Sequence, residues 1–404
     1  MREKIKLPEG WRWERLSNIG RIITGNTPSR SEDQYYGGNI PWIKPGDLDK
    51  DVFVSKSAEY LTEKGVQKAR LLPQGTILVS CIGYVGKMAI ADTILTTNQQ
   101  INSLILDNNY NGKYVFYALK NSMQFYVGKA NQALVPIINA TDFGKITIPL
   151  PPNFEEQTRI ANEVELKIAE VEKIRQAAYR QKEAIATVRE AILREAFPYK
   201  EGDKLPEGWR WEKLGRLGSL SQGGTPSTNN IDYWNGEIPF ITGADVTKLY
   251  ISEARSFLSE KGLNSGKTEK CEKSDLLIVS RTRVGRIGIA GTTIGISQDI
   301  TALKVNNEYD VKYLAMYLKS ISERLVESCQ GATIKGLTKH YIEKIAIPIP
   351  PNKGDQIAIG NELERKMAEV EKLRKAGDSQ SEAVGALPGA VLREVFELEE
   401  QRIG

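Results

Sequence analysis

Residues 151–197 read PPNFEEQTRIANEVELKIAEVEKIRQAAYRQKEAIATVREAILREAF, and residues 350–396 repeat the pattern. After Pro-Pro-Asn, each segment is rich in Glu, Lys, Arg, Ala and branched apolar residues. The apolar residues recur at steps of four, seven and three, which is the heptad spacing of a coiled coil. The first apolar stripe comprises Ile160, Val164, Val171, Ile174, Ala178, Ile185, Val188 and Ile192. The second comprises Ile359, Leu363, Val370, Leu373, Gly377, Val384, Leu387 and Val391.

Two such helices in one chain can bury their stripes against each other. The alternative is that each helix lies separately on its own domain, but so narrow and long a stripe suits a helical partner better. Asn153 is placed to cap the first helix, and Glu155 and Glu156 favour the positive end of its dipole. Phe197 precedes a proline, which disfavours a helical conformation at that residue and ends the helix there.

The second helix is less regular than the first. Gly377, Gly385, Pro388 and Gly389 all lie within it. Because proline removes a backbone donor and clashes with the preceding turn, we expect a kink or a break near Leu387 and Pro388.

The chain is one module written twice. The string LPEGWRWE at 7–14 returns at 205–212, and Thr-Pro-Ser at 27–29 returns at 225–227. Further along, Val-Gly-Lys at 85–87 corresponds to Val-Gly-Arg at 284–286. A repeat of nearly two hundred residues is a whole domain with its helix rather than a solenoid unit.

Within each module, short apolar runs predict strands and longer periodic segments predict helices, so the globular parts are expected to be mixed α/β domains. The expected strands are 76–80, 145–149, 276–280 and 344–348, and the expected helices are 114–124 and 313–325. The expected segments are a first domain at 1–150, a long helix at 151–197, a linker at 198–204, a second domain at 205–349, a second long helix at 350–397 and a tail at 398–404. The fold class is thus α+β, with two mixed α/β domains separated by two long antiparallel helices that form an intramolecular coiled coil with pseudo-two-fold symmetry.

Composition narrows the class of protein. The 404 residues carry a net charge of only +4, which neither requires nor excludes nucleic acid, because a local basic patch can hide in a near-neutral total. The three cysteines are far apart and form no C-x-x-C pair, which favours a reducing cytoplasm. No apolar run reaches the length of a membrane span, and the first residues lack the apolar core of a signal peptide.

The motifs of common enzymes are missing. The sequence contains no phosphate-binding G-x-x-x-x-G-K-[ST] loop and no G-x-S-x-G nucleophile elbow. His340 is the single histidine, so no pair of histidines can hold zinc, and we expect no metal and no cofactor on this chain. The string PPNF at 151–154 has the wrong order for the Asn- or Asp-Pro-Pro-aromatic motif of base methyltransferases, and it is better interpreted as a helix start.

What remains is recognition chemistry, and the two modules can be compared with each other. Positions that differ on loops could carry distinct specificities. After the buried strand, one module reads SCIGYVGK at 80–87 and the other reads SRTRVGR at 280–286. Arginine can contact guanine bidentately, so we expect one arginine of the second loop to read a base and another to hold a phosphate. The alternatives are three phosphate contacts or a solvated loop.

Two further loops differ between the modules, at 98–100 against 297–299 and at 131–139 against 331–340. Asn and Gln suit adenine, although both are equally common in turns. The complete set of candidate DNA-binding residues is Arg30, Lys44, Tyr84, Lys87, Gln99, Gln100, Asn131, Asn139, Arg281, Arg283, Arg286, Gln298, Lys335, Lys339 and His340.

These features together resemble the specificity subunit of type I restriction–modification enzymes. The resemblance rests on the doubled Leu-Pro-x-Gly-Trp opening, the Gly-x-Thr-Pro-Ser turn, the Ile-Pro-aromatic-Ile step and the Ile-Pro-x-Pro-Pro lead into a long helix. It implies two target recognition domains that each read half of a split DNA sequence, with the helices setting the unread spacer. It also implies two modification (methyltransferase) subunits that bring S-adenosylmethionine, restriction subunits, and double-stranded DNA as ligand. The lack of a long apolar run predicts no membrane partner.

Two other hypotheses stay open at the level of sequence. One is a stand-alone enzyme acting on DNA, against which the missing motifs argue. The other is a two-headed scaffold that binds two protein partners without DNA specificity. Salt-dependent DNA binding distinguishes the scaffold from the reader, because phosphate contacts impose a steep dependence on salt.

Overall fold

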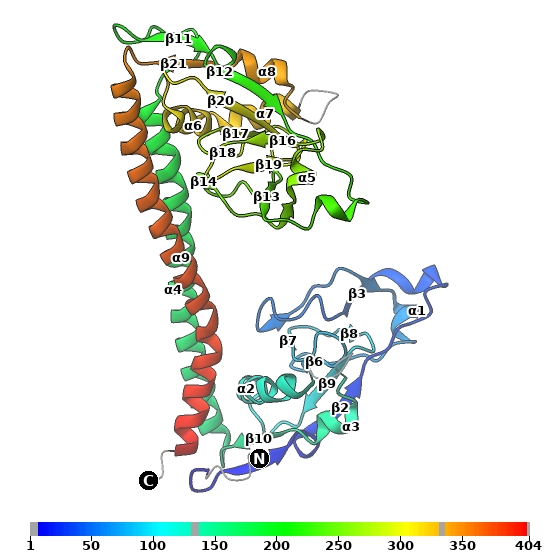
Figure 1. Ribbon diagram of the computed structural model, residues 1–404. Coiled ribbons are helices and arrows are strands. Elements are labelled where there is room, and N and C mark those ends of the chain that lie inside the picture. Colours follow the sequence, from blue (N-terminus) through cyan, green and yellow to red (C-terminus); the bar gives the residue numbers. More distant parts are fainter. Residues whose placement is uncertain (1–6, 131–136, 331–335, 402–404) are drawn as a thin grey trace. The chain divides into compact units, whose positions relative to one another are not determined.

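The computed structural model describes residues 7–130, 137–330 and 336–401. The chain divides into two compact units, which do not coincide with the two sequence repeats. Unit 1 runs to Ala178 and resumes at Gln380, and unit 2 spans Tyr179–Ser379. Each unit therefore consists of one globular head and a part of both long helices, α4 (Phe154–Ala196) and α9 (Lys353–Gln401) (Figure 1).

The two heads repeat the same main sheet, strand for strand. Its order is β2-β9-β6-β7-β4 in the first head and β12-β20-β17-β18-β14 in the second. In both, the edge strand β4 or β14 runs parallel to its neighbour and the other pairs are antiparallel. The bounds are β2 (Gly20–Thr24), β9 (Ile101–Leu106), β6 (Ile77–Ser80), β7 (Met88–Ala91), β4 (Phe53–Val54), β12 (Gly218–Gln222), β20 (Ile300–Val305), β17 (Leu276–Val279), β18 (Ile287–Ala290) and β14 (Tyr250–Ile251).

Smaller sheets complete each head. A second sheet has the order β5-β3-β8 in the first head and β15-β13-β19-β16 in the second, and a two-stranded ladder joins β1 to β10 and β11 to β21. The bounds are β1 (Arg12–Arg15), β3 (Tyr36–Ile43), β5 (Tyr60–Leu61), β8 (Thr96–Thr97), β10 (Thr147–Leu150), β11 (Arg210–Lys213), β13 (Ile238–Ile241), β15 (Ser256–Leu258), β16 (Glu269–Cys271), β19 (Ile294–Ile296) and β21 (Ala346–Ile349). The strands at 145–149 and 344–348, each expected to end at a proline, are observed at 147–150 and 346–349. Pro149 and Pro348 therefore lie inside them, where a ladder of only two strands tolerates a missing donor.

Short helices connect these strands. The expected helix at 114–124 is confirmed as α2, and the one at 313–325 forms as two successive helices, α6 and α7. The bounds are α1 (Glu63–Val66), α2 (Gly112–Ala130), α3 (Ala140–Gly144), α5 (Glu260–Leu263), α6 (Val311–Ser320), α7 (Ser322–Gln330) and α8 (Lys339–Lys344), with 3-10 turns at Leu16–Asn18, Asp33–Tyr35, Leu214–Arg216 and Ile231–Tyr233. Along the described residues no helix is long and apolar enough to cross a membrane.

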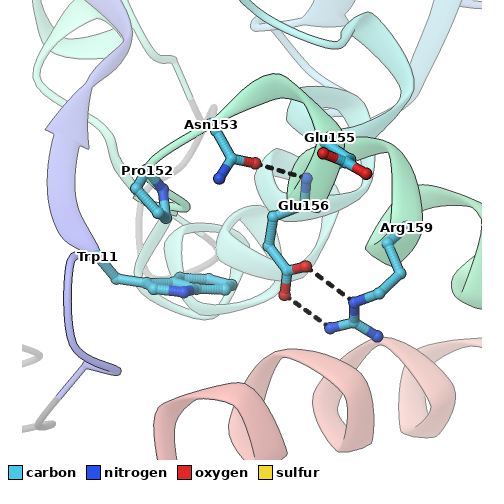
Figure 2. Close-up of a pocket in the computed structure, with 6 residues that line it drawn as sticks. All are labelled: Trp11, Pro152, Asn153, Glu155, Glu156 and Arg159. Atoms are coloured by element: carbon cyan, nitrogen blue, oxygen red, sulfur yellow. Dashed lines mark hydrogen bonds and ion pairs between the residues drawn. The ribbon is translucent and has the colours of Figure 1, made fainter.

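The start of α4 is built as the sequence predicts. The Asn153 side chain accepts a hydrogen bond from the Glu156 backbone N–H at 2.8 Å, so it caps the helix. Figure 2 shows this helix start, which lines an open pocket together with Trp11 and Pro152. The volume of the pocket is about 470 Å³. The Arg159 guanidinium donates to both oxygens of the Glu156 carboxylate at 2.8 and 2.9 Å, so these two charges on the pocket wall pair with each other.

The two long helices run antiparallel where they pack. Within unit 2, Lys182 on α4 pairs with Asp378 on α9 at 2.7 Å, whereas Ile192 and Ala196 share a core with Ile359 and Leu363. One row of the predicted stripes is buried: Val164, Val171, Ala178, Leu363, Val370, Val384 and Val391. The interleaved row is buried at its start, where Ile160 lies in the core of unit 1, but it is exposed along the middle of the helices, because two helices share only a narrow seam. Ile174 and Val188 are each 46% exposed and Leu373 is 54% exposed, so their predicted burial is wrong.

The irregular second helix is continuous. Of the kink or break expected near Leu387 and Pro388, the break is wrong, because α9 runs through Pro388 to Gln401. The missing proline donor costs one backbone hydrogen bond. Burial of Val384, Val391 and Leu392 on the same helix holds the turns on both sides of the proline.

Each long helix ends inside a hydrophobic core. Phe396, near the end of α9, is 1% exposed and its ring lies 5.9 Å from Tyr114 in the core of unit 1. Phe197, which follows α4, lies 5.5 Å from Tyr313 and 5.3 Å from Tyr317 in the core of unit 2. The helix that begins on one head therefore supplies a core residue to the other unit.

We expect Phe396→Ala to destabilise unit 1 and Phe197→Ala to destabilise unit 2, each by about 3–5 kcal/mol, since both leave a cavity in a packed core. Hydrogen exchange read separately over α2 and α6 measures the two effects. Val188→Ala is the matched control, because that side chain is exposed on α4, the helix that Phe197 directly follows. Equal loss of protection in α2 and α6 from either substitution would contradict this assignment.

Candidate nucleic-acid interface

Three of the loops that differ between the modules meet at the end of one strand in each head. In the first head, Cys81 donates its N–H to the Gln100 carbonyl at 2.8 Å and accepts from the Ile138 N–H at 2.9 Å. In the second head, Ser280 donates to the Asp299 carbonyl at 2.8 Å and accepts from the Leu337 N–H at 2.8 Å. The backbone thus brings the three variable segments together in the same way twice, at the carboxyl ends of β6 and β17, and we call this place the variable edge of each head.

The loop after β6 presents an exposed aromatic ring. The Ser80 hydroxyl closes this loop by donating to the Tyr84 carbonyl and accepting from the Lys87 N–H. Tyr84 is 76% exposed, and the Lys87 ammonium lies 5.0 Å from the centre of its ring. A flat ring with a cation on its face is suited to stacking and to a nearby phosphate.

The loop after β17 presents arginine at the equivalent place. Arg283 corresponds to Tyr84, because 283 − 84 and 286 − 87 both equal 199. Arg281 and Arg283 are exposed. Arg286 is only half-buried, and it donates to the carbonyls of Ala244 at 3.3 Å and Val246 at 3.5 Å, so its guanidinium is already engaged by the fold.

The backbone of this second loop is strained. Thr282 has a φ of +61°, and the equivalent Gly83 has a φ of +74°. A β-branched residue in this region costs of order 1–3 kcal/mol and persists only where its surroundings hold it. Here the bridge between Arg281 and Gly336 and the 2.6 Å hydrogen bond from the Arg283 N–H to the Arg281 carbonyl hold the turn that displays the two arginines.

The predicted glutamines bond within the fold. Gln99 accepts from the Thr27 hydroxyl, and Gln298 accepts from the Thr225 hydroxyl in the other head. Gln100 accepts from the Asn98 amide at 2.9 Å. The bond from threonine to glutamine is present in both heads, and it ties the Thr-Pro-Ser loop to the variable edge.

Arg30 and Lys44 form a cluster found only in the first head. Both cations bond the Glu59 carboxylate and lie over the Trp42 ring at 4.8 and 4.6 Å. These hydrogen bonds hold the pKa of Glu59 below its usual value. The equivalent residues of the second head are Thr228, Thr242 and Ser256, so the cluster adds charge to one head alone.

The remaining predicted residues lie around the third loop. Asn139 is the N-cap of α3, where its side chain accepts from the Asp142 N–H at 2.8 Å. Lys339 and His340 are exposed at the start of α8, and the His340 ring nitrogen lies 3.8 Å from Glu343. Asn131 and Lys335 lie outside the described residues.

Sequence reasoning missed that Tyr84 and Arg283 occupy equivalent positions in the two heads, and that Arg286 donates hydrogen bonds to backbone carbonyls. The first was readable from the repeat offset, whereas the second depends on carbonyls forty residues away. For metal chemistry, no group of three or more acidic, histidine or cysteine side chains is gathered anywhere in the described part of the chain.

We expect Asn139→Ala to lower the stability of the α3 region by about 0.5–2 kcal/mol, because a capping hydrogen bond is lost. Asn139→Thr is the matched control, since Thr338 caps α8 at the equivalent position by accepting from the Tyr341 N–H at 3.1 Å. Thermal unfolding and DNA affinity are measured for both variants. A loss of affinity in Asn139→Thr without a loss of stability would instead identify Asn139 as a contact to DNA.

Comparisons with known proteins agree with this architecture. The type I restriction modification DNA specificity domain matches twice, over residues 8–175 and 206–376. The chain is 27% identical over 367 residues to the type I restriction enzyme MjaIX specificity subunit of Methanocaldococcus jannaschii, covering 86% of this chain and 84% of that protein. It is 35% identical over 150 residues to the HindI specificity subunit of Haemophilus influenzae, covering 36% of this chain and 33% of that protein.

Solved structures share the fold. A chain from a structural study of complex assembly and conformational transition of the type I R-M system matches with a TM-score of 0.80 and 22% identity, covering 97% of this chain and 98% of that one. The HsdS subunit from Thermoanaerobacter tengcongensis matches with a TM-score of 0.60 and 21% identity, covering 98% and 99%. With two matched domains that span most of its length, this chain belongs to the type I restriction modification DNA specificity family.

Proposed function

We propose that this chain is the DNA-reading subunit of a type I restriction–modification complex, in which each head reads one half of a bipartite target. The observation that carries the proposal is the duplicated variable edge. Both heads build it from the same three segments and the same backbone hydrogen bonds, and the side chains on it differ. A constant frame with variable exposed side chains suits two readers of different sequences.

The chemistry of each edge suggests what it reads. The exposed guanidiniums of Arg281 and Arg283 suit the paired acceptors of guanine, and each good bidentate pair contributes about 1–3 kcal/mol of discrimination. In the first head, Tyr84 offers apolar contact and Lys87 a phosphate contact. Lys339 and His340 extend the edge of the second head, and Arg30 and Lys44 add to the charge of the first.

The long helices are proposed to set the spacer between the half-targets. A helix of 43 residues is about 65 Å long at about 1.5 Å per residue, which is close to two turns of B-form DNA. Both ends of this helix are anchored in cores, by Ile160 in unit 1 and by Phe197 in unit 2.

The same helices are proposed to bind two modification subunits. Leu166, Ile174 and Tyr179 are exposed apolar side chains on α4, and Leu373 is one on α9. Apolar side chains left in solvent along a helix suit a protein partner. S-adenosylmethionine and methyl transfer are then supplied by the partner, and restriction subunits complete a cytoplasmic complex in which this chain is not catalytic by itself.

We expect Arg283→Ala to relax the half-target of the second head and leave the other half unchanged. The loss at the affected base pair should be about 1–3 kcal/mol, roughly 5- to 150-fold, when the complex with the modification subunit binds duplexes carrying single base changes. Tyr84→Ala is the matched variant and should affect only the other half. Equal weakening of both halves by either variant would contradict base reading by these residues.

The scaffold hypothesis predicts a different outcome for DNA binding by the complex of the wild-type protein. A complex whose DNA affinity did not change with salt, or that protected no bipartite site in footprinting, would favour a two-headed protein scaffold. Mapping methylated adenines in the host genome reports both half-targets and their separation in one measurement.

A further inference from the structure

A basic cavity lies beside the variable edge of the second head. It has a volume of about 790 Å³ and is open to solvent on one side. Its walls come from α4, the end of α6, the first turns of α7, the loop after β17 and the loop after β13. The charged side chains on these walls are Arg189, Lys248, Arg286, Lys319, Glu323 and Glu327.

Lys319 is the central observation. It is partly buried at the end of α6, and no carboxylate among the described residues lies within ion-pair distance of its ammonium. Burial, together with the nearby Arg189 guanidinium, lowers the pKa of Lys319 to about 8. Two cations that share a partly desolvated wall repel each other, so the free fold holds this lysine at a cost.

In the first head, the equivalent lysine has a carboxylate partner. Lys120 corresponds to Lys319, and its ammonium pairs with the Asp49 carboxylate at 2.7 Å. The position of Asp49 is taken by Thr247 in the second head, and the helix position of Arg189 is taken by Pro388 in unit 1. The second head has thus lost an acid and gained a cation at one place, which leaves an anion site open there and closed in its duplicate.

The position of the cavity favours DNA as the source of the anion. Gly285, with a φ of +85°, lets the loop after β17 pack against α7, and a Cβ there would lie 2.8 Å from the Ser322 carbonyl. Residues 284–287 of this loop line the cavity, whereas Arg281 and Arg283 of the same loop are exposed beside it. A duplex read by those arginines would pass its backbone along the same loop.

We propose that the cavity of the second head binds a phosphate of the DNA backbone next to the half-target that this head reads, with Lys319 and Arg189 as its main ligands. The inference rests on the proposed function and deepens it. Of the four basic groups on the walls, Lys248 pairs with Glu253 at 3.6 Å and Arg286 donates to two backbone carbonyls, which leaves Lys319 and Arg189 to bind an anion. Glu323 and Glu327 lie on the α7 wall. A phosphate supplies the negative charge that would balance Lys319 and Arg189, and it can bind them without a metal ion.

The main test adds a carboxylate partner for Lys319 and keeps the lysine itself. Thr247→Asp supplies the carboxylate that the first head already has, and it should fill the cavity with an internal ion pair. In the complex with the modification subunit, we expect DNA affinity to fall about tenfold. The slope of log affinity against log salt should become shallower by about 0.9, the value for one lost phosphate contact. Lys319→Met should give the same shallower slope and raise the Tm by roughly 2–4 °C, because an unpaired, partly buried charge is removed.

Matched controls come from the duplicate. Lys120→Met in the first head should leave the salt slope unchanged, since that lysine is already neutralised by Asp49. Inorganic phosphate at constant ionic strength should raise the Tm of the wild-type chain more than that of Thr247→Asp or Lys319→Met. An equal rise in all three proteins would indicate a general salt effect and overturn the site.

The outcomes separate this inference from the proposed function. If wild-type DNA binding is bipartite and both cavity variants keep its salt slope, the phosphate site is wrong and the reading function stands. If the variants keep the slope but lose affinity for the modification subunit without DNA, the cavity takes an acidic protein group and the proposal is overturned. If the wild-type complex shows no salt-dependent binding at all, the proposed function itself fails.

Discussion

The insertion of each long helix into a core that it did not start from is the constraint on which the architecture depends. Phe396 closes the core around Tyr114, and Phe197 closes the core around Tyr313 and Tyr317. Each core therefore contains an aromatic residue from the far end of the helix that follows the other module, although each module carries its own sheets.

This reciprocal packing also explains which features are kept in both copies. The Tyr114 hydroxyl donates to the Pro149 carbonyl at 2.7 Å, and the Tyr313 hydroxyl donates to the Pro348 carbonyl in the same way. These bonds tie the helix-bearing core to the two-stranded ladder that leads into each long helix. They fix the frame, and the frame leaves the ends of β6 and β17 free to carry different side chains.

The differences between the copies concentrate in charge. The first head has Arg30 and Lys44 clamped by Glu59 over Trp42, and it pairs Lys120 with Asp49. The second head lacks that cluster, and among the described residues no carboxylate pairs with its Lys319, while Arg281 and Arg283 are exposed. The two heads thus place their free positive charge in different positions on one shared backbone. Electrostatic affinity in such a protein can be redistributed by side chains alone, because the scaffold pays little for a change in an exposed loop.

The sequence alone determined the features that follow from local patterns and from the repeat. These are the duplicated modules, the strands that end at Ser80 and near Ser280, the cap at Asn153 and the seven-residue row at Val171 and Val370. Apolar periodicity, capping chemistry and repeat offsets act over a few residues, or are visible as identity, so no tertiary contact was needed to find them.

Only the tertiary structure decided which side chains those elements expose. Ile174 and Leu373 fit the heptad as well as Val171 does, yet they lie in solvent because two helices cover a single seam. Arg286 lies in the same loop as Arg283 but bonds carbonyls far along the chain, and Pro388 stays within a helix because flanking residues are buried. The meeting of three distant loops at one strand end, and the open cavity around Lys319, depend on contacts between segments tens to more than a hundred residues apart, which no local pattern encodes.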